Sequence, residues 1–257
     1  MNQLRTFLLL ALCSAPLWVS AQNFEVKSIR GGRYEITSAL DASIPQGARD
    51  FLAPYKQKVD SMMCPVLGES ASYMRSFRPE SPLSNLIADI LRVEAVNVTG
   101  KPVDLAVCNI GGIRSALPQG PVTVGDILEI APFENMYCVV TLSGEHLLEL
   151  FSQIAAVKGE GVSGIKLKIS SEGKLLQATV AGKPVEPKRD YRIATLDYLS
   201  EGNDKLYAFK KASCVETTTL PVREVLMSYI KEQARKGLKV DAKIEGRITV
   251  EGYENKN

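Results

Sequence analysis

Hydrophobic residues recur along the chain at the three- and four-residue spacings of amphipathic helices. The first such pattern predicts a helix over residues 46–63. Pro65 is expected to end it, because proline cannot continue the helical hydrogen-bond ladder. Its apolar positions are Phe51, Leu52, Tyr55, Val59, Met62 and Met63.

The same spacing, combined with capping residues, predicts further helices. Pro82 suits the first turn of one, Thr123 and Asp126 form an N-cap pair for another, and Ser143 caps a third. These helices are expected over residues 81–97, 123–130, 143–157 and 221–236.

Shorter runs rich in β-branched residues predict strands. Turns at Glu172–Gly173 and Ala181–Gly182 indicate that three of the strands form a meander. Residues 22–45 alternate weakly, which predicts a short strand or an extended N-terminal arm. The strands are expected over residues 103–108, 136–142, 165–170, 174–180 and 190–196, with a last one that holds Ile248 and Val250.

Helices and strands are partly segregated along the chain, so the predicted fold class is α+β: a single domain with mixed β-sheet layers covered by helices. The domain is expected over residues 46–253, with a polar tail over 254–257. With 257 residues, 45% of them hydrophobic, the chain can bury one substantial core or two small ones.

The first 21 residues have the features of a secretory signal peptide. Arg5 precedes an apolar run, and small residues stand before the expected cleavage site after Ala21, so export to the periplasm or beyond is predicted. Lipid attachment at Cys13 is the alternative, which the bulky Leu12 disfavours. No apolar stretch approaches the roughly 20 residues that a bilayer requires, so no membrane span is expected.

Charge and cysteine content exclude some classes of function. The formal net charge is +2, which offers no basic field for nucleic acid. No two cysteines form a CxxC zinc pattern. Cys108 and Cys138 lie in strand-like runs and are expected to be buried thiols, whereas a disulfide between Cys64 and Cys214 is left open by the sequence.

A loop with two glycines follows the strand predicted at 103–108. Asn109 opens it, Gly111 and Gly112 allow a ligand to approach the backbone closely, and Arg114 presents a guanidinium suited to an anionic group. A tight turn with an exposed arginine is the alternative interpretation.

A second candidate is the segment around Phe133, which Pro132 precedes and Asn135 follows. An aromatic face beside an amide can stack on a base and hydrogen-bond to its edge. A core phenylalanine beside a turn-forming asparagine is the alternative.

A third candidate is the polar loop from Tyr198 to Asp204, which follows the strand predicted at 190–196. Its carboxylate can only accept hydrogen bonds, which suits the vicinal hydroxyls of a ribose. A purely solvated loop is the alternative.

Residues for hydrolysis are sparse in this sequence. Two-metal phosphoester hydrolysis requires several His, Asp and Asn ligands, and the only histidine is His146, expected to face solvent in the first turn of a helix. No Gly-x-Ser-x-Gly, P-loop or His-Glu-x-x-His stretch occurs. We therefore predict no catalytic residue, no metal ligand and no cofactor in this chain.

Taken in order, these loops and several shorter motifs resemble the C-terminal domain of the bacterial 5'-nucleotidase family, exported enzymes that dephosphorylate nucleotides. Each motif is weak alone, but the ordered set, from about Gln46 to Val250, is specific. The motifs are Glu80-Ser81, Asn85-Leu86-Ile87-Ala88-Asp89, Asn109-x-Gly111-Gly112-Ile113-Arg114, Thr123-Val124-Gly125-Asp126, Pro132-Phe133-x-Asn135, Leu142-Ser143-Gly144 and Gly202-Asn203-Asp204.

In that family this domain holds the nucleotide, with the base between two aromatic rings. The resemblance implies that Phe133 and Tyr198 are the rings. It further implies that Asn135 binds the base edge, Asp204 the ribose hydroxyls and Arg114 the phosphate. Two further arginines and a pocket glycine, either Gly159 or Gly161, are also implied. The predicted substrate-binding set is Arg75, Arg78, Asn109, Gly111, Gly112, Arg114, Phe133, Asn135, Gly161, Tyr198 and Asp204.

Two positions depart from the family pattern. The family usually has phenylalanine where Tyr198 stands and glycine where Asn203 stands. The tyrosine keeps a stacking face, whereas Asn203 is expected to alter the backbone of its loop.

Family members normally carry an N-terminal metallophosphatase domain with two metal ions, whereas residues 1–45 are expected to form only a leader and an arm. The leading hypothesis is a nucleotide-binding, specificity-conferring domain of a 5'-nucleotidase-type hydrolase. It would act in nucleotide catabolism with a separately encoded metallophosphatase that holds the divalent metals.

The alternatives are a stand-alone nucleoside- or nucleotide-binding protein and a remnant that binds nothing; hydrolysis by this chain alone is least favoured. Base preference, partner identity and oligomeric state are left open.

Overall fold

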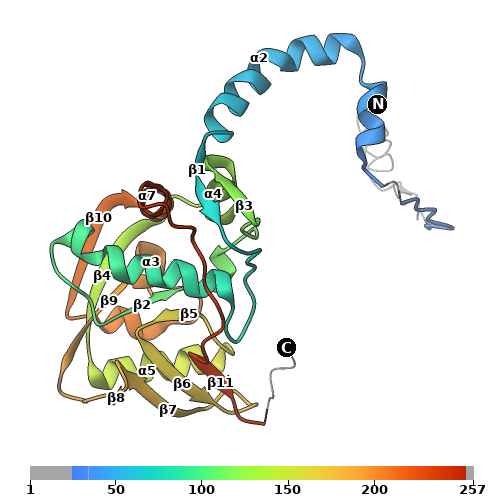
Figure 1. Ribbon diagram of the computed structural model, residues 1–257. Helices are drawn as coiled ribbons and strands as arrows, with labels where there is room; N and C mark the ends of the chain where they lie inside the picture. Colours follow the sequence, from blue (N-terminus) through green and yellow to red (C-terminus); the bar gives the residue numbers. More distant parts are fainter. Residues whose placement is uncertain (1–24, 34, 253–257) are drawn as a thin grey trace, which may run out of the picture. The chain divides into compact units, whose positions relative to one another are not determined.

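The computed structural model describes residues 25–33 and 35–252 (Figure 1). The chain divides into one unit that ends at Phe51 and a second that begins at Leu52. The predicted leader and the predicted polar tail lie outside the described residues. In the first unit, a 3-10 helix, η1 (Ser38–Ser43), occupies part of the segment for which a strand or extended arm was predicted. That prediction is corrected here, because Ala39 and Leu40 favour helical turns over an extended backbone.

Helix α2 (Gln46–Met63) has the bounds that the hydrophobic spacing predicted, and Pro54 lies within it. None of its residues is buried. The apolar side chains of Leu52, Val59 and Met62 are all at least half exposed. The spacing therefore predicted the helix correctly but says nothing of its burial.

The second unit contains three β-sheets, and a mixed sheet is among them, as the predicted α+β class requires. In the five-stranded sheet, β2 and β9 are parallel and the other neighbours antiparallel. Its order is β10 (Cys214–Pro221), β4 (Met136–Ser143), β9 (Asp190–Leu196), β2 (Leu105–Cys108), β5 (Gly161–Ser163). The four-stranded sheet has the order β11 (Ile248–Val250), β6 (Ile165–Ile169), β7 (Leu175–Val180), β8 (Lys183–Pro184), and the two-stranded sheet pairs β1 (Val66–Ser70) with β3 (Gly120–Thr123).

The predicted meander is wrong in its third strand. β6 and β7 pair as expected, but the turn at Ala181–Gly182, where both residues have positive φ, leads into the short β8. β9 instead lies between β4 and β2 in the other sheet. The burial pattern gives the reason: β9 is buried along most of its length, as a central strand is, whereas β6 alternates between buried and exposed residues.

The remaining helices lie close to their predicted positions. Ser81 and Ser143 cap α3 and α5, and Thr123 forms a reciprocal capping box with Asp126 at α4. α3 contacts β2, β5 and β9, while α5 contacts strands of both larger sheets, so the buried residues form one continuous core. Within the described residues, no helix is both long and apolar enough to span a bilayer. The helices are α3 (Pro82–Thr99), α4 (Val124–Ile130), α5 (Gly144–Ala156) and α7 (Val222–Arg235).

The cysteines of the described residues are free thiols. Cys108 and Cys138 are buried, as predicted, and burial raises the pKa of both thiols. Cys64 and Cys214 are exposed and unpaired, so the disulfide that the sequence left open is not formed.

Candidate functional site

The register of the five-stranded sheet brings the three candidate loops to one edge. β2 and β9 are parallel neighbours, so their carboxyl ends, at Cys108 and Leu196, lie together. β4 runs antiparallel to β9 and begins at this same edge, where Tyr137 pairs with Leu196. The loops after β2, before β4 and after β9 therefore converge, as the loops at the carboxyl ends of parallel strands generally do.

These loops enclose a cavity of about 500 Å³. Every residue that lines it belongs to the binding set predicted from the sequence. The lining residues are Asn109, Gly111, Gly112, Arg114, Phe133, Asn135, Tyr198 and Asp204.

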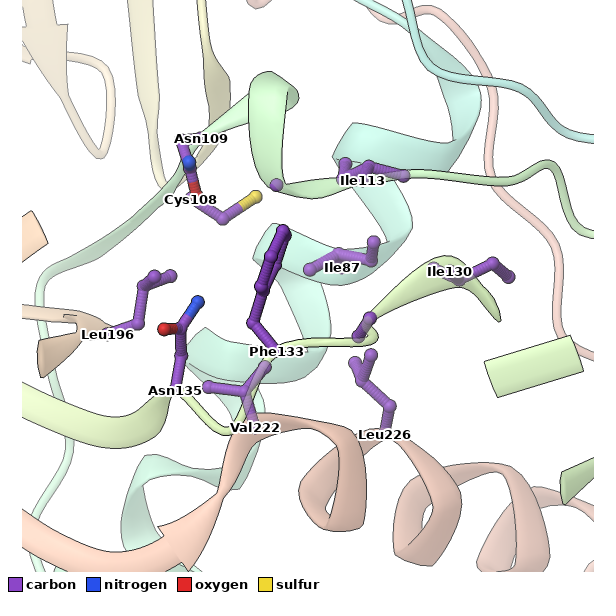
Figure 2. Close-up of a pocket in the computed structure, with 12 residues that line it drawn as sticks. Ile87, Cys108, Asn109, Ile113, Ile130, Phe133, Asn135, Leu196, Val222 and Leu226 are labelled. Atoms are coloured by element: carbon purple, nitrogen blue, oxygen red, sulfur yellow. The ribbon is translucent and has the colours of Figure 1, made fainter. Parts of the chain in front are cut away.

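A smaller apolar hollow of about 40 Å³ adjoins this cavity (Figure 2). Aliphatic side chains from α3, β9 and α7 line it, among them Ile87, Leu196 and Leu226. Figure 2 shows the Phe133 ring in the middle of this group, with the Asn135 amide beside it. Because Phe133 and Asn135 also line the larger cavity, the ring borders an apolar hollow and a polar cavity at once.

The two aromatic rings remain accessible in the larger cavity. Phe133 is 44% exposed and Tyr198 is 38% exposed. The guanidinium carbon of Arg114 lies 5.2 Å from the centroid of the Phe133 ring, within the range of a cation–π interaction. The backbone N–H of Arg114 donates to Ile130 at 3.0 Å, which fixes the end of its loop.

Asp204 connects the loops that follow β2 and β9. Its Oδ2 accepts a hydrogen bond from Asn109 Nδ2 at 2.6 Å, and its Oδ1 accepts one from the Tyr198 hydroxyl at 2.9 Å. The hydrogen bond to Asp204 is the main cause that raises the pKa of Tyr198, so the phenol is a neutral donor at physiological pH.

The loop predicted from Tyr198 to Asp204 begins as a short helix, α6 (Asp197–Ser200), which corrects the prediction of a polar loop for that part. The local cause is Asp197, whose carboxylate accepts from the backbone N–H of Tyr198 at 2.7 Å. The hydroxyl of Ser200 then donates to the Asp197 carbonyl at 2.7 Å, which closes the turn. Tyr198 thus projects from a helical turn at the edge of the sheet.

The two predicted arginines at 75 and 78 are outside the cavity lining. Arg78 forms an ion pair with buried Glu160 and donates from Nε to the Gly159 carbonyl at 2.8 Å. The Arg75 guanidinium carbon lies 5.2 Å from the centroid of the Phe77 ring. Arg78 therefore has a supporting position in this structure, and substrate binding by Arg75 and Arg78 stays a prediction.

Neither Gly159 nor Gly161 lines the cavity, and packing accounts for both. A Cβ on Gly161 would clash with the Cys108 sulfur, where β5 pairs with β2. Gly159 has φ +113, and a Cβ there would clash with the Pro79 carbonyl. These glycines allow chain segments to approach each other closely.

Glu160 was missed by the sequence analysis. Its carboxylate accepts from the backbone N–H of Ile110 and from Arg78, so it supports the loop that carries Gly111 and Gly112. Burial raises the pKa of this carboxyl, an effect opposed by the hydrogen bond from Ile110 and the charge of Arg78. A carboxylate flanked by two glycines was the available signal, but its partners lie far away in sequence.

His146 is partly exposed, and its Nδ1 lies 3.2 Å from the hydroxyl of the capping Ser143. Over residues 25–33 and 35–252, no group of three or more His, Cys, Asp or Glu side chains is arranged to hold a metal ion.

Fold and site together define an α+β domain with a polar and aromatic cavity at one edge of a mixed sheet. The family model for the 5'-nucleotidase, C-terminal domain matches residues 63–211, more than half of the chain. The chain belongs to the 5'-nucleotidase C-terminal domain family.

Relatives of known name support this membership. The chain is 34% identical over 184 residues to cell wall protein Lmo0130 of Listeria monocytogenes, covering 65% of this chain and 23% of that protein. It is 30% identical over 184 residues to the trifunctional nucleotide phosphoesterase protein YfkN of Bacillus subtilis, covering 66% of this chain and 12% of that protein. The chain thus spans less than a quarter of either relative.

Among solved structures, the 5'-nucleotidase precursor from Thermus thermophilus is similar with a TM-score of 0.71 and 28% sequence identity. The similarity covers 81% of this chain and 44% of that chain. The NAD nucleotidase of Haemophilus influenzae, with a TM-score of 0.61 and 22% identity, shares the fold.

Proposed function

We propose that this domain binds a nucleotide or nucleoside in the cavity between the loops after β2, before β4 and after β9. One observation carries the proposal: two accessible aromatic rings, an amide, a carboxylate and a guanidinium all line one cavity of about 500 Å³. Each is a group that one part of a nucleotide requires. A volume of this size also lies in the range of small-ligand sites.

Each lining residue has a role in this proposal. Phe133 and Tyr198 stack on the base, because an aromatic ring can stack on any base whatever its identity. Asn135 hydrogen-bonds to the base edge, since an amide both donates and accepts. Asp204 accepts from the ribose hydroxyls. Arg114 faces the phosphate, which its guanidinium can bind in a bidentate way.

Calorimetric titration of the purified chain with AMP and with adenosine tests this proposal. Stacking contributes about 1 to 3 kcal/mol per ring, so two rings with polar contacts should give dissociation constants of roughly micromolar order. Ribose 5-phosphate is the matched control, and it should bind far more weakly because it lacks a base. Absence of binding to both AMP and adenosine at millimolar concentration would contradict the proposal.

We further propose that the domain confers substrate specificity on a 5'-nucleotidase-type hydrolase, with the two metal ions held by a separately encoded metallophosphatase. Membership of the family supports this, as does the sequence, which has a single histidine and so few of the ligands that a two-metal centre needs.

Co-expression with an exported metallophosphatase from the same genome tests the partnership. We expect the two chains to co-purify and the pair to hydrolyse AMP in the presence of Mn²⁺, with activity reduced at least 10-fold by Arg114→Ala. Nucleotide binding without association or gain of activity would instead favour the stand-alone binding protein. If the purified chain alone hydrolyses AMP and Arg114→Ala lowers this activity, the proposal that a separate chain supplies catalysis is contradicted.

Export of the chain is also proposed, with cleavage after Ala21. The charge and apolar run of residues 1–21 support it, and the Listeria relative is named a cell wall protein. Mass spectrometry of the chain from the periplasmic fraction should give a mature N-terminus at Gln22. A product that retains Met1, or that carries lipid on Cys13, would contradict this assignment.

A further inference from the structure

Two hydrogen bonds between residues of the same loop stabilise the segment from Tyr198 to Lys205. The Asn203 amide donates to the Tyr198 carbonyl at 2.8 Å, and the Tyr198 hydroxyl donates to Asp204 Oδ1 at 2.9 Å. A phenylalanine at 198 and a glycine at 203 could form neither.

The backbone within this loop needs such support. Asp204 has φ +52 and Lys205 has φ +66, so two successive residues with side chains occupy the left-handed region. That conformation is uncommon outside glycine and persists where surrounding contacts determine it. The hydrogen bonds from Tyr198 and Asn203 are contacts of this kind, and the Tyr198 hydroxyl binds the Asp204 carboxylate directly.

Each oxygen of the Asp204 carboxylate already accepts one hydrogen bond from a neighbouring side chain. An ionised carboxylate has about four lone-pair sites, two on each oxygen. The Tyr198 hydroxyl occupies one on Oδ1 and the Asn109 amide occupies one on Oδ2. One site thus stays free on each oxygen of a carboxylate that lines the cavity. Two acceptors side by side match two vicinal hydroxyl donors.

We propose that the Tyr198 hydroxyl is a positioning residue for sugar recognition, which orients the Asp204 carboxylate for a vicinal diol and so selects ribonucleosides over deoxynucleosides. The inference rests on the proposed function, because it assumes that a nucleoside occupies the cavity. It goes beyond stacking, since a phenylalanine at this position would stack equally well. The pKa of Tyr198, raised mainly by the hydrogen bond to Asp204, is consistent with a phenol that stays protonated and donates.

The test compares the wild-type chain with Tyr198→Phe by calorimetric titration with adenosine, 2'-deoxyadenosine and 2',3'-dideoxyadenosine. The variant keeps the ring and removes only the hydroxyl. We expect adenosine to bind about 3- to 10-fold more weakly, the effect of losing one hydrogen bond. Binding of dideoxyadenosine should change less than about 2-fold, because that ligand lacks the 2'- and 3'-hydroxyls that Asp204 is proposed to accept from.

Asp204→Asn is the second variant, because it replaces one of the two acceptor oxygens of the carboxylate with an amide nitrogen that only donates. It should bring the affinities for adenosine and dideoxyadenosine close together. Thermal unfolding curves for both variants serve to show that each is folded.

The outcomes separate this inference from the proposed function. If the wild-type chain binds adenosine but Tyr198→Phe leaves all three affinities unchanged, or weakens all three equally, the positioning role is wrong and nucleoside binding stands. If the wild-type chain binds none of the three ligands, the proposed function fails and the inference fails with it. A loss confined to ligands that carry a 2'- or 3'-hydroxyl supports both.

Discussion

Phe133→Ala is expected to weaken AMP binding by about 5- to 150-fold, because removing a stacking ring costs about 1 to 3 kcal/mol. The upper part of this range is favoured by the position of the ring. Phe133 borders both the main cavity and the apolar hollow, and the Arg114 guanidinium lies over its face. Its loss therefore removes the stacking surface and also the contact that holds Arg114 near the cavity. Calorimetry with AMP on the purified variant measures the effect.

The control for this prediction is Tyr73→Ala. Tyr73 is an aromatic residue that is 63% exposed and does not line the cavity, so its removal should leave AMP affinity within about 2-fold. Because Phe133 is itself 44% exposed, its truncation should cost little folding stability. Equal AMP affinities for the wild-type and Phe133→Ala chains would show that the base does not bind at this ring.

The helices were predictable because their signals are local. The Thr123–Asp126 capping box and the Ser81 and Ser143 caps sit within a turn of the apolar residues that they precede. Three-residue spacing and capping chemistry both act within one helical turn, so one pass along the sequence detects them.

The strands that were missed have weak local signals for identifiable reasons. β10 is one of the two edge strands of its sheet and has no buried residue, so it has no apolar face to detect. β5 is three residues long and begins with Gly161, a residue that is uncommon in strands. The pairing of β9 with β2 and β4, instead of with β7, depends on residues far away in sequence, and a pattern of apolar residues cannot specify it.

For the site, too, single residues could be predicted from nearby sequence, whereas their contacts with distant residues could not. Tyr198 and Phe133 could be chosen from their own loops, but their convergence depends on the register in which Tyr137 pairs with Leu196. The ion pair between Arg78 and Glu160 links residues 82 positions apart, and no spacing rule predicts it. Sequence reasoning therefore could not find the contact by which Arg78 and Glu160 support the loop that begins at Asn109.

Arg247→Met is expected to lower the free energy of unfolding by about 3 kcal/mol, the lower end of the cost of breaking a buried ion pair. The Arg247 side chain is 10% exposed, and its guanidinium donates to both carboxylate oxygens of Asp89, at 2.7 and 2.8 Å. It also donates to the Val162 carbonyl and to Glu245, so it joins the C-terminal segment to α3 and β5. The lower end applies because the Asp89 side chain is 38% exposed and water can rehydrate it.

Urea denaturation of the purified variant measures this loss, and Arg235→Met is the matched control. Arg235 is 78% exposed and its ion pair with Glu232 is 3.5 Å long, so its loss should cost less than about 0.5 kcal/mol. In a double-mutant cycle with Asp89→Asn, the coupling energy should be about 1 to 3 kcal/mol, since the two side chains share one network. If Arg247→Met destabilises the chain no more than Arg235→Met does, the C-terminal segment is held by β11 and its backbone hydrogen bonds alone.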